Sequence, residues 1–229
     1  MGVVQLIDIV CPVLQEHELT LDAIISTRGE HSAGRTSELA GRISLGGPYA
    51  VPVTSEFVAA DSDLRAFVEQ EADSTFHLVH MSVSFAAEPT TPTFDTVTLG
   101  LSLTSAGPPT PVAWSMTPLR MTSTSHVEQR LRLGPQLKLV DAEFERTTAR
   151  DREEVYLQAQ RELRSDPAWE FRRTRTAPLH GSHRLVMVIR AGLGQSTAIT
   201  ATVQATVRRP LLRRYKHEVP SAYTLEAVI

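Results

Sequence analysis

The feature that most constrains this chain is a two-residue alternation of apolar and polar side chains that returns in widely separated segments. Between residues 94 and 103, valine and leucine occupy the odd positions from 97 onward, and threonine, glycine or serine occupy the even ones. The segment 197–207 repeats the pattern with a row of threonines. Because successive side chains of a β-strand point to opposite faces, the pattern predicts antiparallel strands with one buried and one solvated face.

Weaker segments extend the same prediction. Apolar residues alternate at the end of 76–85, and 183–190 is a compact apolar run. The segments 112–116, 136–144 and 153–163 also suit strands, although the Glu-, Gln- and Arg-rich composition of the last suits a helix as well. The sequence therefore predicts many short strands along most of the chain, with Gly192 to Gly194 as a turn between two of them.

One segment has helical spacing. Leu64, Phe67 and Val68 follow Asp61 and Ser62, either of which can cap a helix. We expect a mainly β, antiparallel, sandwich-like fold with two sheets or two small sandwich domains and one short helix near residues 61–72.

The charge is divided unevenly along the 229 residues. Residues 1–115 hold 4 basic and 14 acidic side chains, a net charge of −10, whereas residues 116–229 hold 19 basic and 12 acidic ones, a net charge of +7. We expect an acidic mainly β half at 1–120 and a basic mainly β half at 121–229, or one continuous domain. Opposite charges predict attraction between the halves, contact between copies, or docking of separate partners.

Several features favour a cytoplasmic bacterial protein. The single cysteine, Cys11, cannot form an internal disulfide, and the first residues lack the basic region of a signal peptide. No apolar run reaches the roughly 18 residues of a membrane-spanning helix, so we expect no membrane contact. The chain has no asparagine and few lysines, which points to a GC-rich genome.

Motifs for catalysis or cofactor binding are not legible. The sequence has no Gly-x-Ser-x-Gly elbow and no phosphate-binding glycine loop. His77 and His80 point to opposite faces if their segment is a strand, so they cannot share a metal ion. His180 and His183 lie in a turn where their rings can converge, but zinc needs further ligands. We expect no catalytic, cofactor or metal site, with this turn as the starting point for any unrecognised enzyme.

Basic residues near the C-terminus form the candidate interaction site. Two clusters combine arginine with aromatic residues, a mixture that can track a phosphate backbone and stack on bases. The alternative interpretation is that these cations pair with the acidic half. The candidate residues are Arg208, Arg209, Arg213, Arg214, Tyr215 and Lys216 in one cluster and Arg172, Arg173 and Arg175 in the other.

Three functions follow as hypotheses. The first is a non-enzymatic protein-interaction or assembly module that uses its oppositely charged halves to form a homo-oligomer or to dock a protein partner. The second is binding of nucleic acid, or another polyanion, through the arginine-rich segment. The third is an enzyme with an unrecognised site. A pI near 6.2 is low for a dedicated nucleic-acid domain, which favours the first.

Overall fold

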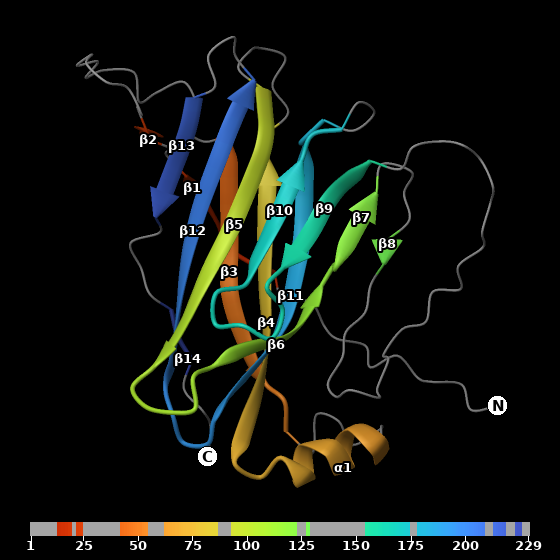
Figure 1. The fold of residues 1–229 in the computed structure, drawn as a ribbon, viewed down its shortest axis with the longest axis vertical. Coiled ribbons are helices and arrows are strands. Elements are labelled where there is room, and N and C mark those ends of the chain that lie inside the picture. The colour runs from red at the N-terminus through yellow and green to blue at the C-terminus, as the bar shows by residue number, and fades with distance from the viewer. Residues whose placement is uncertain are drawn as a thin grey trace, which may run out of the picture.

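The computed structural model describes residues 13–19, 22–24, 42–54, 62–86, 93–122, 127–128, 154–174, 178–208, 213–218 and 223–225. These segments form two antiparallel β-sheets stacked face to face, with one helix at an end of the stack (Figure 1). The mainly β, sandwich-like fold with one short helix that the alternation predicts is therefore confirmed. The helix, α1, spans Ser62–Gln70, inside the predicted range.

The smaller sheet, sheet A, has five strands. Its two longest strands, β4 and β11, pair along their whole length, and β3 and β6 flank them. In spatial order the strands are β1 (Glu16–Leu19), β3 (Ile43–Pro52), β4 (Ser74–Phe85), β11 (Gly181–Gly192) and β6 (Val112–Thr117).

The larger sheet, sheet B, has nine strands, and the pairing of β12 with β5 forms its centre. In spatial order its strands are β2 (Asp22–Ile24), β13 (Arg213–Glu218), β12 (Thr197–Arg208), β5 (Thr93–Ser105), β10 (Ala168–Arg172), β9 (Val155–Gln160), β7 (Arg120–Thr122) and β8 (Val127–Glu128), and β14 (Tyr223–Leu225) also pairs with β12.

Strands from the acidic and basic halves of the sequence alternate within both sheets. In sheet A, β11 lies between β4 and β6, and in sheet B, β5 lies between β10 and β12. The two halves are thus joined by main-chain hydrogen bonds rather than by one contact surface. Among the described residues, the charge asymmetry of the sequence does not correspond to two separate bodies.

The core lies between the sheets and consists of the inward positions that the alternation predicts. Val97, Leu99, Leu101 and Leu103 of β5 are all at most 4% exposed. Trp169 of β10 is fully buried beside them and donates a hydrogen bond from Nε1 to the carbonyl oxygen of Pro118, at 3.2 Å. Trp169 is therefore part of the core between the sheets.

The helix closes one end of sheet A with aromatic contacts. Phe67 of α1 packs against Phe76 of β4 and Trp114 of β6, with ring centroids 5.5 and 6.3 Å apart. The guanidinium of Arg190 lies over the Trp114 ring at 5.0 Å. No helix in the described part of the chain is long and apolar enough to cross a membrane.

Three further predictions from the sequence have different outcomes in the structure. The segment 153–163 contains strand β9 and no helix among its described residues, because its apolar alternation is satisfied by pairing with β10 and β7. The predicted turn at Gly192 to Gly194 is confirmed, with Gly194 at φ +69°. The predicted strand at 136–144 lies outside the described residues.

Replacing Trp169 by phenylalanine should lower the free energy of unfolding by about 2 kcal/mol, because it leaves a cavity and an unpaired Pro118 carbonyl group. Urea unfolding followed by far-UV circular dichroism measures the change. The control is Trp114→Phe, which alters a half-buried tryptophan of β6 that packs under the helix rather than in the core, and which should cost less. Equal losses for the two variants would contradict the central role of Trp169.

Candidate binding face

The outer face of sheet B carries hydroxyl and amide side chains at every outward position of its two central strands between residues 96–104 and 198–206 except Gly100 and Ala198. Residues directly opposite in an antiparallel ladder share a face, so the outward residues of β5 and β12 lie side by side. All of them are exposed or half-buried. These are Thr96, Thr98, Ser102 and Thr104 on β5, and Thr200, Thr202, Gln204 and Thr206 on β12.

The register aligns some of the predicted cationic residues with this face. Arg172 is opposite Thr96, which is opposite Thr206, and Thr206 is opposite Arg214. Arg172 and position 214 therefore end one row across four strands, with backbones about 14 Å apart at the usual strand spacing. Lys216 is opposite Gln204 in the next row.

The remaining predicted residues are distributed elsewhere. Positions 213 and 215 are opposite Val207 and Ala205 of β12. The backbone N–H of Arg173, which follows β10, donates to the carbonyl oxygen of Asp95 at 2.9 Å, and position 208 ends β12. Arg175 and Arg209 lie outside the described residues. The structure thus brings position 214 into the same row as Arg172, with position 216 in the next row.

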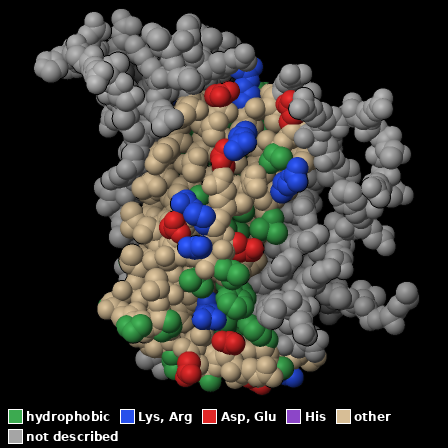
Figure 2. Space-filling model, viewed as in Figure 1, with side chains coloured by type: hydrophobic (Ala, Val, Ile, Leu, Met, Phe, Trp, Pro, Cys, Tyr) green, Lys and Arg blue, Asp and Glu red, His purple; other side chains and the backbone are tan. Residues whose placement is uncertain are grey.

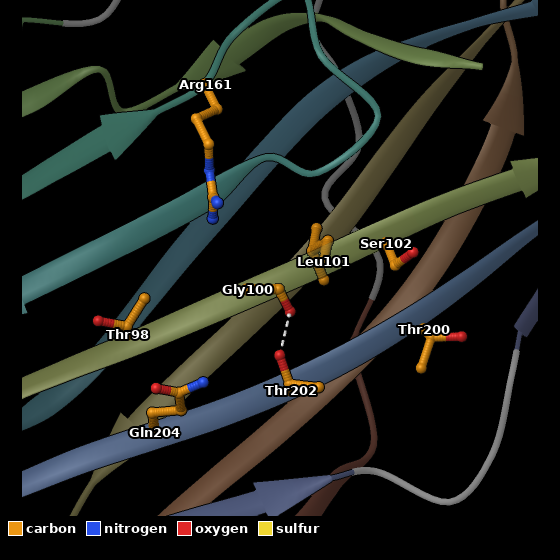
Figure 3. A pocket seen from close by; sticks show the side chains of 8 residues that line it. All are labelled: Thr98, Gly100, Leu101, Ser102, Arg161, Thr200, Thr202 and Gln204. Atoms are coloured by element: carbon orange, nitrogen blue, oxygen red, sulfur yellow. Dashed lines mark hydrogen bonds between the residues drawn. The ribbon is translucent and has the colours of Figure 1, made fainter. Parts of the chain in front are cut away.

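A hollow of about 320 Å³ opens in the hydroxyl field (Figure 3). It forms where the row across β10, β5 and β12 has small side chains, because Ala168 is opposite Gly100 and Gly100 is opposite Thr202. A Cβ atom added to Gly100 would approach Thr202 Oγ1 to 3.0 Å. The hollow is lined by Thr98, Gly100, Leu101, Ser102, Arg161, Thr200, Thr202 and Gln204.

Arg161 reaches this hollow from the turn between β9 and β10, residues 161–167. Arg161 and Leu163 have φ angles of 59° and 63°, a left-handed conformation that costs side chains other than glycine roughly 1–2 kcal/mol each. Figure 3 shows the Arg161 side chain extending from the turn toward Gly100 of β5.

Hydrogen bonds to both sheets hold the turn in this conformation. Leu101 and Leu103 of β5 donate their N–H groups to the carbonyl oxygens of Pro167 and Ser165, at 2.8 and 2.7 Å. On the other side, the N–H of Leu163 donates to the carbonyl oxygen of Ala113 of β6 at 2.8 Å, and the N–H of Ala113 donates to the carbonyl oxygen of Arg164 at 3.0 Å. The turn therefore fixes Arg161 relative to sheet A as well as sheet B.

The carboxylates next to the hollow are paired with cations. Asp166 accepts a hydrogen bond from Nη1 of Arg161 at 3.0 Å. Glu170 accepts hydrogen bonds from Arg172 and Gln160, and its hydrogen bond raises the pKa of Arg172. The side of the hollow nearest β10 and its turn is thus close to neutral.

Sequence reasoning missed Arg161 and the hollow. Left-handed backbone is usually marked by glycine or asparagine, and neither occurs at positions 161 or 163. The one signal for the hollow is that two neighbouring strands each have a small outward residue, Gly100 and Ala168, and that these two residues are opposite each other. That signal requires the register, which one sequence does not provide.

A second cluster lies between the sheets, around His183 of β11. Tyr156 is an extra residue of β9 with no partner in β7, because Met121 pairs with Leu157 and Thr122 with Val155. This β-bulge turns Tyr156 toward His183, with the phenol oxygen 3.0 Å from Nε2. Rings of Phe85 and Phe171 pack on the same imidazole at 5.7 and 5.4 Å.

Burial controls the titration of this cluster. Desolvation lowers the pKa of His183, although a hydrogen bond to the carbonyl oxygen of His180 opposes the shift. Desolvation also raises the pKa of Tyr156. Both groups are therefore neutral at pH 7, and they act as packing and hydrogen-bonding groups.

The histidines His77 and His80 point to opposite faces of their strand, as their spacing predicts. His77 is opposite Ile189, which faces the core, and His80 is opposite Val186, which faces outward, so the two rings point to opposite faces. In the second pair, His180 Nδ1 lies 3.0 Å from the carbonyl oxygen of Pro178. No group of three metal-binding side chains occurs in the described ranges.

The fold is that of a two-sheet, mainly β protein whose sheet B has a polar outer face. No protein-family model matches the chain, and no curated protein matches it either. One solved structure, described as "Crystal structure of the Clostridium perfringens NetB toxin in the membrane inserted form", overlaps 93% of this chain and 94% of its own with 7% identity and a TM-score of 0.37. Another, described as "Pore forming protein", overlaps 67% and 79% with 6% identity and a TM-score of 0.28. At these TM-scores neither likeness bears on function.

Replacing Leu163 by glycine should raise the free energy of unfolding by about 1 kcal/mol, because glycine adopts its left-handed φ without strain. Urea unfolding measures the change. The control is Leu193→Gly, which alters an equally exposed leucine whose φ is not positive, and which should lower stability. A loss of stability in both variants would show that the turn is not strained at this position.

Stability should fall as the pH drops below about 6.5. Burial lowers the pKa of both His183 and His80 from the ordinary value of 6.5, with Arg184 adding to the shift of His80. The unfolded chain therefore takes up protons before the folded one does, and the contribution of the neutral rings is complete only above pH 6.5. Urea midpoints at pH 7.5 and 5.5 should differ less in His183→Gln and His80→Gln than in the parent. An unchanged difference in both variants would refute this assignment.

Proposed function

We propose that this protein is a non-enzymatic binding module that recognises a glycan through the polar outer face of sheet B. The observation that carries the proposal is the field of hydroxyl and amide groups over β5 and β12, with a hollow in its middle. Hydroxyl groups both donate and accept hydrogen bonds, as sugar hydroxyls do, so the two surfaces can satisfy each other in either direction.

The rigidity of the face supports this role. Each outward threonine belongs to a long ladder, and two of the hydroxyls also bond main-chain oxygens, Thr202 to Gly100 at 3.3 Å and Thr206 to Thr96 at 3.5 Å. Side chains fixed before binding lose little conformational entropy when a ligand arrives. A sheet face is therefore a better platform for polar recognition than a loop.

Other partners have less support from the described residues. Centres of protein interfaces are enriched in aromatic residues and methionine and depleted in serine, whereas the outward positions of β5 and β12 are threonine, serine, glutamine, glycine and alanine. Binding of a polyanion favours a field of one sign, but Figure 2 shows cationic and acidic side chains interspersed over the described part of this face. Self-association and nucleic-acid binding stay predictions, and the experiment below includes both.

The chemistry of the hollow favours binding over catalysis. Arg161 is the one ionisable side chain among the residues that line it. A guanidinium stays protonated at neutral pH, so it donates hydrogen bonds and does not act as a general base. The lining therefore provides the groups that hold a ligand.

Glycan binding should weaken about tenfold when the hydroxyls of the hollow are removed in the double variant Thr98→Val and Thr200→Val. Valine has the shape of threonine and a high strand propensity, so the fold is retained while two ligand hydrogen bonds are lost. A glycan array identifies ligands, and titration calorimetry measures their affinity for parent and variant.

The matched control is Thr104→Val, which removes a hydroxyl from the same face outside the hollow and should leave affinity unchanged. Light scattering at low and high salt, with absorbance at 260 nm, accompanies the array. If no glycan binds, and the protein forms an oligomer that salt dissociates, self-association replaces this proposal. Co-purifying nucleic acid without glycan binding would support the polyanion alternative.

A further inference from the structure

The hollow contains one feature that a neutral sugar does not need, which is the guanidinium of Arg161. A guanidinium has five N–H donors, and the ion pair with Asp166 engages one nitrogen of Arg161, Nη1. The side chain extends toward Gly100, where the sheet has no side chain to meet it (Figure 3). A planar guanidinium matches a carboxylate, which accepts two parallel hydrogen bonds from it.

The backbone places this arginine at a cost. Its φ of 59° is strained, and main-chain hydrogen bonds on both sides of the turn keep it there. Strained residues of this kind concentrate where a side chain must be held in position for a ligand. Arg161 is half-exposed, at 49% for its side chain, so it is accessible to a ligand in the hollow.

The surrounding charges permit an anionic group. Glu170 is bonded to Arg172, which reduces its repulsion of an incoming carboxylate, whereas Asp166 is bonded to Arg161 itself through the single nitrogen Nη1. Around the guanidinium, the hollow provides the neutral hydroxyls of Thr98, Ser102 and Thr200 and the amide of Gln204. A guanidinium with N–H donors beyond its bond to Asp166, next to neutral hydroxyl groups, suits a ligand with one carboxylate and several hydroxyls.

We infer that the hollow binds an acidic sugar residue, with its carboxylate on Arg161 and its hydroxyls on the side chains of β5 and β12. The volume of about 320 Å³ is at the lower end of the range for small-ligand sites, so it accommodates one sugar residue rather than a long segment. This inference rests on the proposed function, because it names the sugar that the same face selects.

The test compares two ligands that differ in the carboxylate alone, a glucuronic acid oligosaccharide and the same oligosaccharide after reduction of its carboxyl groups. Titration calorimetry at 50 mM and 300 mM salt should show at least tenfold tighter binding of the acidic form by the parent. Arg161→Ala should remove this preference and retain binding of the neutral form. Free glucuronate, measured in parallel, distinguishes recognition of a single sugar from recognition of a chain, and binding of either supports the site.

Two further variants keep the result interpretable. Arg161→Gly removes the guanidinium with a residue that tolerates the left-handed φ, and should behave like Arg161→Ala without loss of stability. Arg184→Ala removes an exposed arginine from the outer face of sheet A and should leave the preference intact.

Different failures have different meanings. If the parent binds the acidic and neutral forms equally, or if Arg184→Ala lowers the preference as much as Arg161→Ala does, the acidic-sugar site is refuted and the proposed function survives. If neither oligosaccharide binds and the glycan array is also empty, the proposed function itself fails.

Discussion

The ladder between β5 and β12 determines both the core and the candidate binding face. It runs from Thr197 opposite Ser105 to Arg208 opposite Thr93, with one register shift near its end. Along most of the ladder the rungs alternate between two apolar side chains that face inward, such as Val203 opposite Leu99, and two polar side chains that face outward, such as Gln204 opposite Thr98. A slip of one residue would exchange the faces, burying hydroxyls and exposing leucines, so burial of the core fixes the register. The arrangement of outward threonines is therefore determined by the same hydrophobic energy that holds the two sheets together.

The turn between β9 and β10 connects this ladder to the rest of the molecule. It continues the pairing of β10 along β5 and then bonds β6 at the edge of sheet A. The backbone of β6 is thereby hydrogen-bonded on the side away from β11, so this edge does not present free groups to another strand at Ala113. These hydrogen bonds offset the conformational strain of the left-handed backbone at Arg161 and Leu163. The same seven residues, 161–167, therefore position Arg161 at the hollow and occupy hydrogen-bonding groups of β6, the edge strand of sheet A.

Much of the fold follows from the sequence because two-residue alternation is a direct result of strand geometry. The strands around Val97 and Val203 and the helix that begins at Ser62 are where the pattern places them. The sequence does not reveal which strands pair, since alternation is the same for any neighbour. For that reason the sequence gives two arginine-rich segments but not the row across β10, β5, β12 and β13 that Arg172 and position 214 end. Tyr156 and Arg161 were also beyond reach, because a bulge and a left-handed turn are set by tertiary hydrogen bonds.

The separation of inward and outward positions on β5 and β12 also has an evolutionary consequence. Thr98, Thr200 and Gln204 contribute nothing to the apolar core, so substitutions there change the surface that a ligand meets without a change in core packing. Leu99 and Val203 are constrained by the neighbours they fill space against. One pair of strands can therefore keep a stable scaffold while the specificity of its outer face diverges, and libraries randomised at the outward positions alone can be searched for new ligands.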